Sequence, residues 1–104
     1  VVAIVYDPTA PGTPTVGTAS VSSGTVTVPA TAPNSANVAL LRFYRGTTTF
    51  GAATALTPPV FVTANQSVAL ADVPGAGTWK YWCTAENGSG VASAEAGPAT
   101  ATVP

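Results

Sequence analysis

Few side chains in this chain of 104 residues could perform chemistry. It contains no histidine, one cysteine (Cys83) and four carboxylates, Asp7, Asp72, Glu86 and Glu95. Activating a Ser, Thr or Cys nucleophile requires a base, and the imidazole that most often serves is missing. The four carboxylates lie in separate segments, so we expect no catalytic pair, and one thiol without histidine cannot hold zinc. The sequence therefore predicts a protein that is not an enzyme and that has no cofactor and no metal site.

Charge and hydropathy restrict the partners. The chain has three basic and four acidic residues and a net charge of −1. Nucleic-acid binding needs clustered Lys and Arg, and a membrane-spanning helix needs about 20 consecutive apolar residues. Neither is present, so we expect no nucleic-acid partner and no membrane insertion. So little charge suits a module held in an assembly or on an outer surface better than a freely diffusing domain.

The segment from residue 79 to residue 86 is the clearest element. Apolar and polar residues alternate along it, which is typical of a strand with one buried face. We expect Cys83 to be a buried core residue on that face. The apolar positions are Trp79, Tyr81, Cys83 and Ala85.

A second strand is predicted over residues 38–45. Leu41 and Phe43 would lie on its inner face, and Arg42 and Tyr44 on its outer face. We expect Phe43 to be a core residue.

The remaining chain consists of short β-rich runs separated by Gly- and Pro-containing turns. Residues 22–24 indicate a hairpin, Pro29 to Ser35 a loop, and residues 91–94 and 99–103 a final strand on both sides of Gly97-Pro98. About seven short strands with turns every 8–12 residues or so predict an all-β, two-sheet antiparallel sandwich.

Three segments resemble parts of known domain families. Residues 73–79 and 83–90 resemble the corner and penultimate strand of fibronectin type III domains, and Tyr81-Trp82-Cys83 resembles the Tyr-x-Cys of immunoglobulin-like domains. Val28 and Phe43 stand where immunoglobulin domains have a Cys and a Trp, so either subfamily remains open. The Ala- and Thr-rich composition is similar to that of accessory domains in tailed-phage virion proteins and bacterial surface or secreted proteins.

The two families differ in the aromatic residue at the corner before this strand. The fibronectin register places Trp79 there and the immunoglobulin register places Tyr81. A phenol donates readily to a backbone carbonyl, so we expect Tyr81 to close the corner.

The first twelve residues differ from the rest. We interpret residues 1–12 as an apolar arm with a Pro/Gly linker, and residues 13–104 as the sandwich domain. An apolar run is costly to leave in water, so we expect the arm to add to the open sheet edge of a neighbour, either another copy or a scaffold protein. The alternative is that the arm is the end of a preceding domain. The residues of the arm are Val1, Val2, Ile4, Val5 and Tyr6.

An interaction surface is predicted on the outer face of the central strands. The alternation places Trp82 there, close to Tyr44 and Arg42. Exposed Trp, Tyr and Arg are typical of binding hot spots. The alternative is that the Trp82 ring only lies over strand backbone, covered by the stem of Arg42 or Arg45.

These patterns indicate a non-catalytic structural or interaction module located in a virion or at the cell surface. Its partners would be other virion or surface-assembly proteins, including further copies of itself. The alternative is a carbohydrate-binding module of a secreted glycan-active enzyme, in which the outer aromatic residues would stack weakly on sugars.

Overall fold

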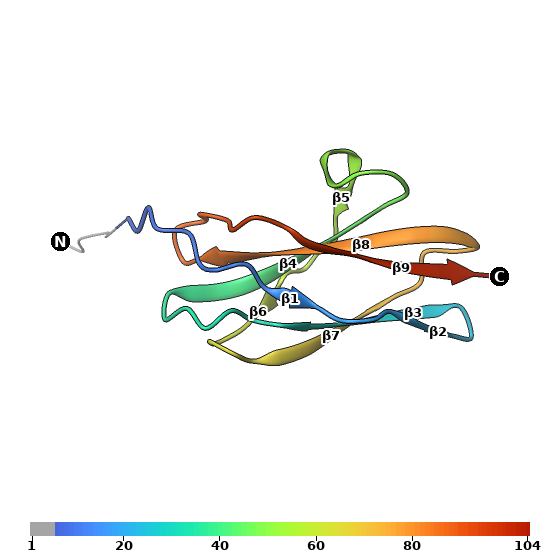
Figure 1. Cartoon of the computed structure of the whole chain (residues 1–104), viewed down its shortest axis with the longest axis horizontal. Coiled ribbons are helices and arrows are strands. Elements are labelled where there is room, and N and C mark those ends of the chain that lie inside the picture. Colours follow the sequence, from blue (N-terminus) through green and yellow to red (C-terminus); the bar gives the residue numbers. More distant parts are fainter. Residues whose placement is uncertain (1–5) are drawn as a thin grey trace.

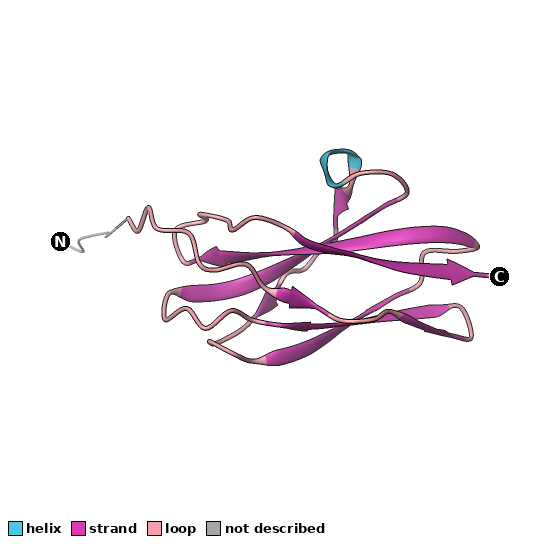
Figure 2. Ribbon diagram, viewed as in Figure 1, coloured by secondary structure: helices cyan, strands magenta, loops and turns pink. Residues whose placement is uncertain are grey.

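The β-rich runs form two antiparallel sheets that pack face to face (Figures 1 and 2). The structure, a computed structural model, describes residues 6–104. Within these residues the only helical segment is a 3-10 turn of three residues, and no helix is long and apolar enough to cross a membrane. The elements are β1 (Thr15–Val16), β2 (Ser20–Ser22), β3 (Thr25–Thr31), β4 (Val38–Gly46), η1 (Phe50–Ala52), β5 (Thr54–Ala55), β6 (Val60–Phe61), β7 (Ser67–Asp72), β8 (Gly77–Asn87) and β9 (Ala96–Val103).

Each sheet is built around long central strands. In sheet A, β1 and β2 pair with the two ends of the same edge of β3, and β7 pairs with its other edge. In sheet B, β8 lies between β4 and β9, and the far side of β4 pairs with β5 and β6. The short strands β1 and β2 share one position, as do β5 and β6, so the described strands occupy seven positions. The all-β fold with two antiparallel sheets is therefore confirmed.

The two strands predicted most clearly are neighbours at the centre of sheet B. In the β4–β8 register Phe43 lies opposite Cys83, and Leu41 lies opposite Ala85. Leu41, Cys83 and Ala85 are fully buried and Phe43 is 2% exposed, so the predicted inner faces and the burial of Cys83 are confirmed. The core between the sheets consists of Val26, Val28, Ala30, Ala32, Val38, Leu41, Phe43, Val62, Tyr81, Cys83, Ala85, Ala99, Ala101 and Val103.

Burial of Cys83 makes stability depend on alkaline pH. Desolvation raises the pKa of the Cys83 thiol from 9.0 to about 12. The folded state therefore retains the thiol proton that the unfolded chain releases near pH 9. The free energy of unfolding should be unaffected by this group below pH 9 and should fall as the pH rises from 9 towards 12.

Urea unfolding at a series of pH values checks this prediction, and Cys83→Ala is the control. The variant should show a smaller pH dependence between pH 9 and 10, and the slope that remains comes from Tyr81, whose pKa folding also raises. Equal slopes for the two proteins over that interval would contradict the prediction.

The prediction of a loop beginning at Pro29 is wrong, because β3 continues to Thr31. The Pro29 carbonyl accepts a hydrogen bond from the Gly17 amide at 2.9 Å, in the gap between β1 and β2. The N–H and C=O of a strand residue point to the same side. The backbone nitrogen of Pro29, which carries no hydrogen, therefore faces the gap between β1 and β2. No ladder hydrogen bond is lost there, so β3 can contain the proline.

The final strand also differs from the prediction. It runs continuously through Gly97 and Pro98, with a register shift opposite Tyr81 and Cys83. Of residues 91–94, only Ala92 makes a β-bridge, to Glu86.

The expectation that Tyr81 closes the corner before β8 is wrong. The backbone hydrogen bond of the corner is made by Trp79, whose Nε1 donates to the Gly75 carbonyl at 3.0 Å. Trp79 is close enough to the turn to reach back to it. Tyr81 lies two residues further along β8 and is fully buried. Its hydroxyl donates across the sandwich to the Asp72 carboxylate of β7 at 2.7 Å.

The chain enters and leaves the sandwich at opposite ends. The N-terminal segment joins the end that carries the β3–β4 and β8–β9 turns, and β9 ends at the other (Figure 1). We call the first end the entry pole.

Candidate interaction surface

The structure brings the predicted surface residues together on the outer face of sheet B. Tyr44 on β4 lies directly opposite Trp82 on β8, and Arg42 lies opposite Thr84. All three predicted residues therefore belong to one patch, as the alternation indicated.

The expectation that Trp82 is exposed is wrong, because its side chain is only 4% exposed. The loop after β4 folds over the outer face and places Phe50 of η1 against the Trp82 ring, with centroids 6.1 Å apart and an edge-on arrangement. The backbone passes close beneath this loop at Gly46: a Cβ built there would lie 3.2 Å from Ala53 Cα and 3.4 Å from Trp82 Cζ3. Trp82 is thus part of a small second core that also contains Phe50 and Tyr44.

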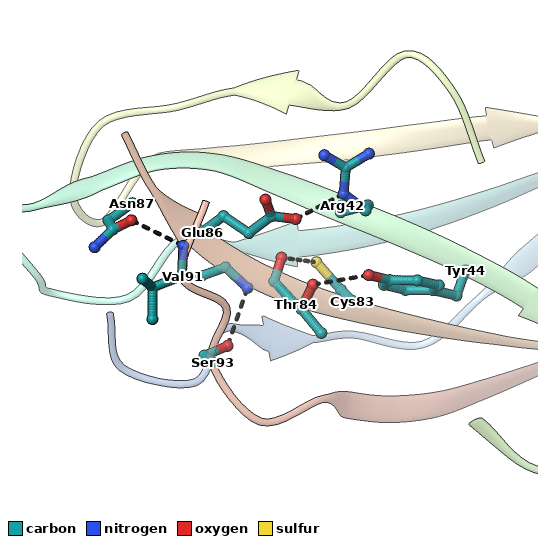
Figure 3. A network of polar contacts seen from close by, with 9 residues as sticks. Arg42, Tyr44, Cys83, Thr84, Glu86, Asn87, Val91 and Ser93 are labelled. Carbon is teal, nitrogen blue, oxygen red and sulfur yellow. Dashed lines mark hydrogen bonds and ion pairs between the residues drawn. The ribbon is translucent and has the colours of Figure 1, made fainter. Parts of the chain in front are cut away.

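The other two surface residues are also engaged. The Tyr44 ring meets Phe50 edge-on at 4.9 Å, and its hydroxyl lies 3.5 Å from Thr84 Oγ1. Arg42 Nε donates to Glu86 Oε2 at 2.6 Å (Figure 3). These contacts tie β4 to β8 and neutralise the Arg42 charge. With Trp82 covered as well, the patch offers no open tryptophan ring on which a sugar could stack.

A polar cluster that joins the two sheets was not predicted. Asp72 Oδ2 accepts from both Tyr81 and Arg45 Nη1, the latter at 2.8 Å, and the Arg45 guanidinium lies 5.1 Å from the centre of the Trp79 ring. Burial, aided by the hydrogen bond to Asp72, raises the pKa of Tyr81 above its ordinary value. No spacing rule connects residues 45, 72 and 81, so the sequence held no signal for this cluster.

The linker is fastened to the entry pole, which the sequence did not predict either. Asn87 is 2% exposed, and its Nδ2 donates to the carbonyls of Asp7 at 2.8 Å and Thr9 at 2.9 Å. Asn37 Nδ2 donates to Asp7 Oδ2 and to the Thr9 carbonyl, and the Asp7 amide donates to Ser89 Oγ. The hydrogen bond from Asn37 is the main cause that lowers the pKa of Asp7. We call this set of contacts the linker anchor.

Asn87 serves the anchor and the following turn at once. Its Oδ1 accepts from the amides of Ser89 and Val91, at 2.9 and 3.0 Å (the second contact is drawn in Figure 3). The sequence Asn87-Gly88-Ser89 matches a glycosylation sequon, but the amide nitrogen that a glycan would modify is buried and donates to two carbonyls. Asn87 therefore has a structural role.

We expect Asn87→Ala to loosen the anchor and to lower the free energy of unfolding by about 2 kcal/mol, because it leaves backbone donors and acceptors without partners. Amide hydrogen exchange at Asp7 and Thr9 should accelerate. The matched control is Asn34→Ala, since Asn34 is an exposed amide that accepts one hydrogen bond, from Asn65. Unchanged exchange in the Asn87 variant would show that other contacts hold the linker.

The arm can be placed only in part. Val1, Val2, Ile4 and Val5 lie outside the described residues, and Tyr6 is 64% exposed. The first residue after the arm, Asp7, is held by the linker anchor, so the apolar run joins the sandwich at a fixed point.

Within residues 6–104 there is no pocket and no group of three side chains suited to hold a metal ion. Comparison of the sequence with protein-family models and with curated proteins finds no match.

Proposed function

We propose that this chain is a non-catalytic structural module, an immunoglobulin-like or fibronectin type III-like sandwich, that joins a virion or cell-surface assembly through its N-terminal arm. The observation that carries the proposal is the linker anchor. It fixes Asp7 and Thr9 to the entry pole through a buried amide. The uncharged, apolar segment Val1–Tyr6 is thereby attached to a rigid body.

The strand order supports the immunoglobulin-like part of the proposal. Three strand positions in sheet A face four in sheet B, and β4, β8 and β9 are adjacent, in keeping with sandwiches of this kind. Trp79 supplies the corner hydrogen bond to the backbone upstream. The core contains one cysteine and no disulfide within the described residues, so stability comes from packing.

The low charge supports a location within an assembly. Only seven residues are charged, and two of the three cations, Arg42 and Arg45, are paired with carboxylates. Such a surface provides little electrostatic repulsion between packed copies. Attachment would then depend on apolar and backbone contacts, which the arm can supply.

Deletion of residues 1–6 tests the proposal. The deleted chain should keep its urea midpoint, because the anchor begins at Asp7, and it should lose self-association in sedimentation experiments. A second variant with the six residues replaced by Gly and Ser separates apolar character from length and should behave like the deletion. A full-length chain that stays monomeric at all concentrations, or a deletion that associates as before, would refute docking between copies through the arm.

A further inference from the structure

The outer edge of β7 is unpaired within the described part of the chain. On its inner side β7 pairs with β3 over six consecutive residues, Ser67 to Asp72, without a register shift. On its other side, no strand and no backbone hydrogen bond from residues 6–104 is present. A strand edge of this kind presents a row of free N–H and C=O groups.

The other sheet edges carry features that discourage pairing. β9 contains Pro98, which has no amide hydrogen to donate, and its pairing with β8 has a register shift. β5 and β6 have two residues each and are separated by Pro58 and Pro59. β1 and β2 are short, and neither pairs with β3 at Pro29. β7 contains no proline, lysine or bulge, and is thus the most regular open edge in the described structure.

The side chains beside this edge are incompletely covered. Val68 and Leu70 of β7 pack against the core, yet they are only partly buried. A further strand beside β7 would cover them. Residues 67–71 carry no charge that would repel it, and the Asp72 carboxylate is already bound to Arg45 and Tyr81.

We propose that the β7 edge accepts residues 1–6 of a second copy of this chain as an added strand, a proposal that rests on the docking function of the arm. The segment Val1-Val2-Ala3-Ile4-Val5-Tyr6 matches the six-residue length of β7 and contains no charge and no proline. In an extended strand Val2 and Ile4 share one face, as Val68 and Leu70 do. Asp7 is fastened at the entry pole by Asn37, Asn87 and Ser89, and Tyr6 before it is 64% exposed, so the proposal places the acceptor on a neighbouring molecule.

Lysines on the acceptor edge test the site. Ala69 and Ala71 are exposed, so Ala69→Lys with Ala71→Lys should leave the urea midpoint nearly unchanged while raising the dissociation constant for self-association at least about tenfold. The matched control places lysines at the exposed positions Thr100 and Thr102 of β9, and should associate like the parent.

A mixing experiment tests the β7 acceptor edge separately from the docking function of the arm. The chain lacking residues 1–6 keeps an open acceptor edge, and the Ala69→Lys, Ala71→Lys chain keeps its arm. Neither should self-associate, but the mixture should form a one-to-one pair in sedimentation. Failure to form this pair, or a loss of association in the Thr100→Lys, Thr102→Lys control alone, overturns the β7 site. If deletion of the arm still abolishes association of the parent, the docking function stands and its acceptor lies elsewhere.

Discussion

Phe43→Ala should lower the free energy of unfolding by about 3–5 kcal/mol, the usual cost of removing a buried aromatic side chain. Phe43 is 2% exposed at the centre of the core and lies opposite Cys83 in the β4–β8 pair. Domains of this size have a total stability of about 5–15 kcal/mol, so the loss is a large fraction. Urea unfolding followed by tryptophan fluorescence measures it.

The chain contains a matched control for this change. Phe61 is the same residue type in the same sheet but is 74% exposed. Phe61→Ala should change the free energy of unfolding by no more than about 0.5 kcal/mol. Similar midpoints for the two variants would show that Phe43 is not a central core residue.

Trp82→Ala should also destabilise the domain, by about 3–5 kcal/mol, although Trp82 points away from the core between the sheets. The substitution removes the ring on which Phe50 packs and leaves the loop between β4 and β5 without support. Proteolysis should then cleave the chain within residues 47–53 before the rest of the domain. Urea unfolding and limited proteolysis measure the two effects.

Lys80→Ala is the control for Trp82, since Lys80 occupies the same face of β8 and is only partly buried. It should unfold close to the parent. If Trp82→Ala were equally mild, the loop would not depend on the tryptophan, and a surface role for the ring would again be open.

Alternation along the strands predicted which residues share a face, but not what covers that face. It correctly placed Leu41 and Phe43 on the inner side of β4 and Cys83 on the inner side of β8. It also placed Trp82 with Tyr44 on the outer side. The burial of Trp82 depends on Phe50, which lies in a loop with no periodic pattern, so strand periodicity held no information about it.

Contacts between residues far apart in sequence limited the remaining predictions. The phenol of Tyr81 favours a corner hydrogen bond, but the sequence does not show that Asp72, an acceptor on the other sheet, lies within its reach. Asn87 Oδ1 accepts hydrogen bonds within the adjoining turn, whereas its Nδ2 donates to residues about 80 positions earlier in the sequence. The loop predicted from Pro29 is wrong because the gap between β1 and β2, which accommodates the proline within β3, is not apparent in the sequence.

The linker anchor has a mechanical consequence. It joins Asp7 to Asn87, the last residue of β8, while the chain leaves the opposite end through β9, the antiparallel partner of β8. Tension applied at residues 7 and 103 would draw β8 and β9 in opposite directions along their lengths. Their hydrogen bonds are perpendicular to the strands, so the ladder is loaded in shear and its bonds resist together. As long as the linker anchor holds, the sandwich should resist extension when force is applied between residues 7 and 103.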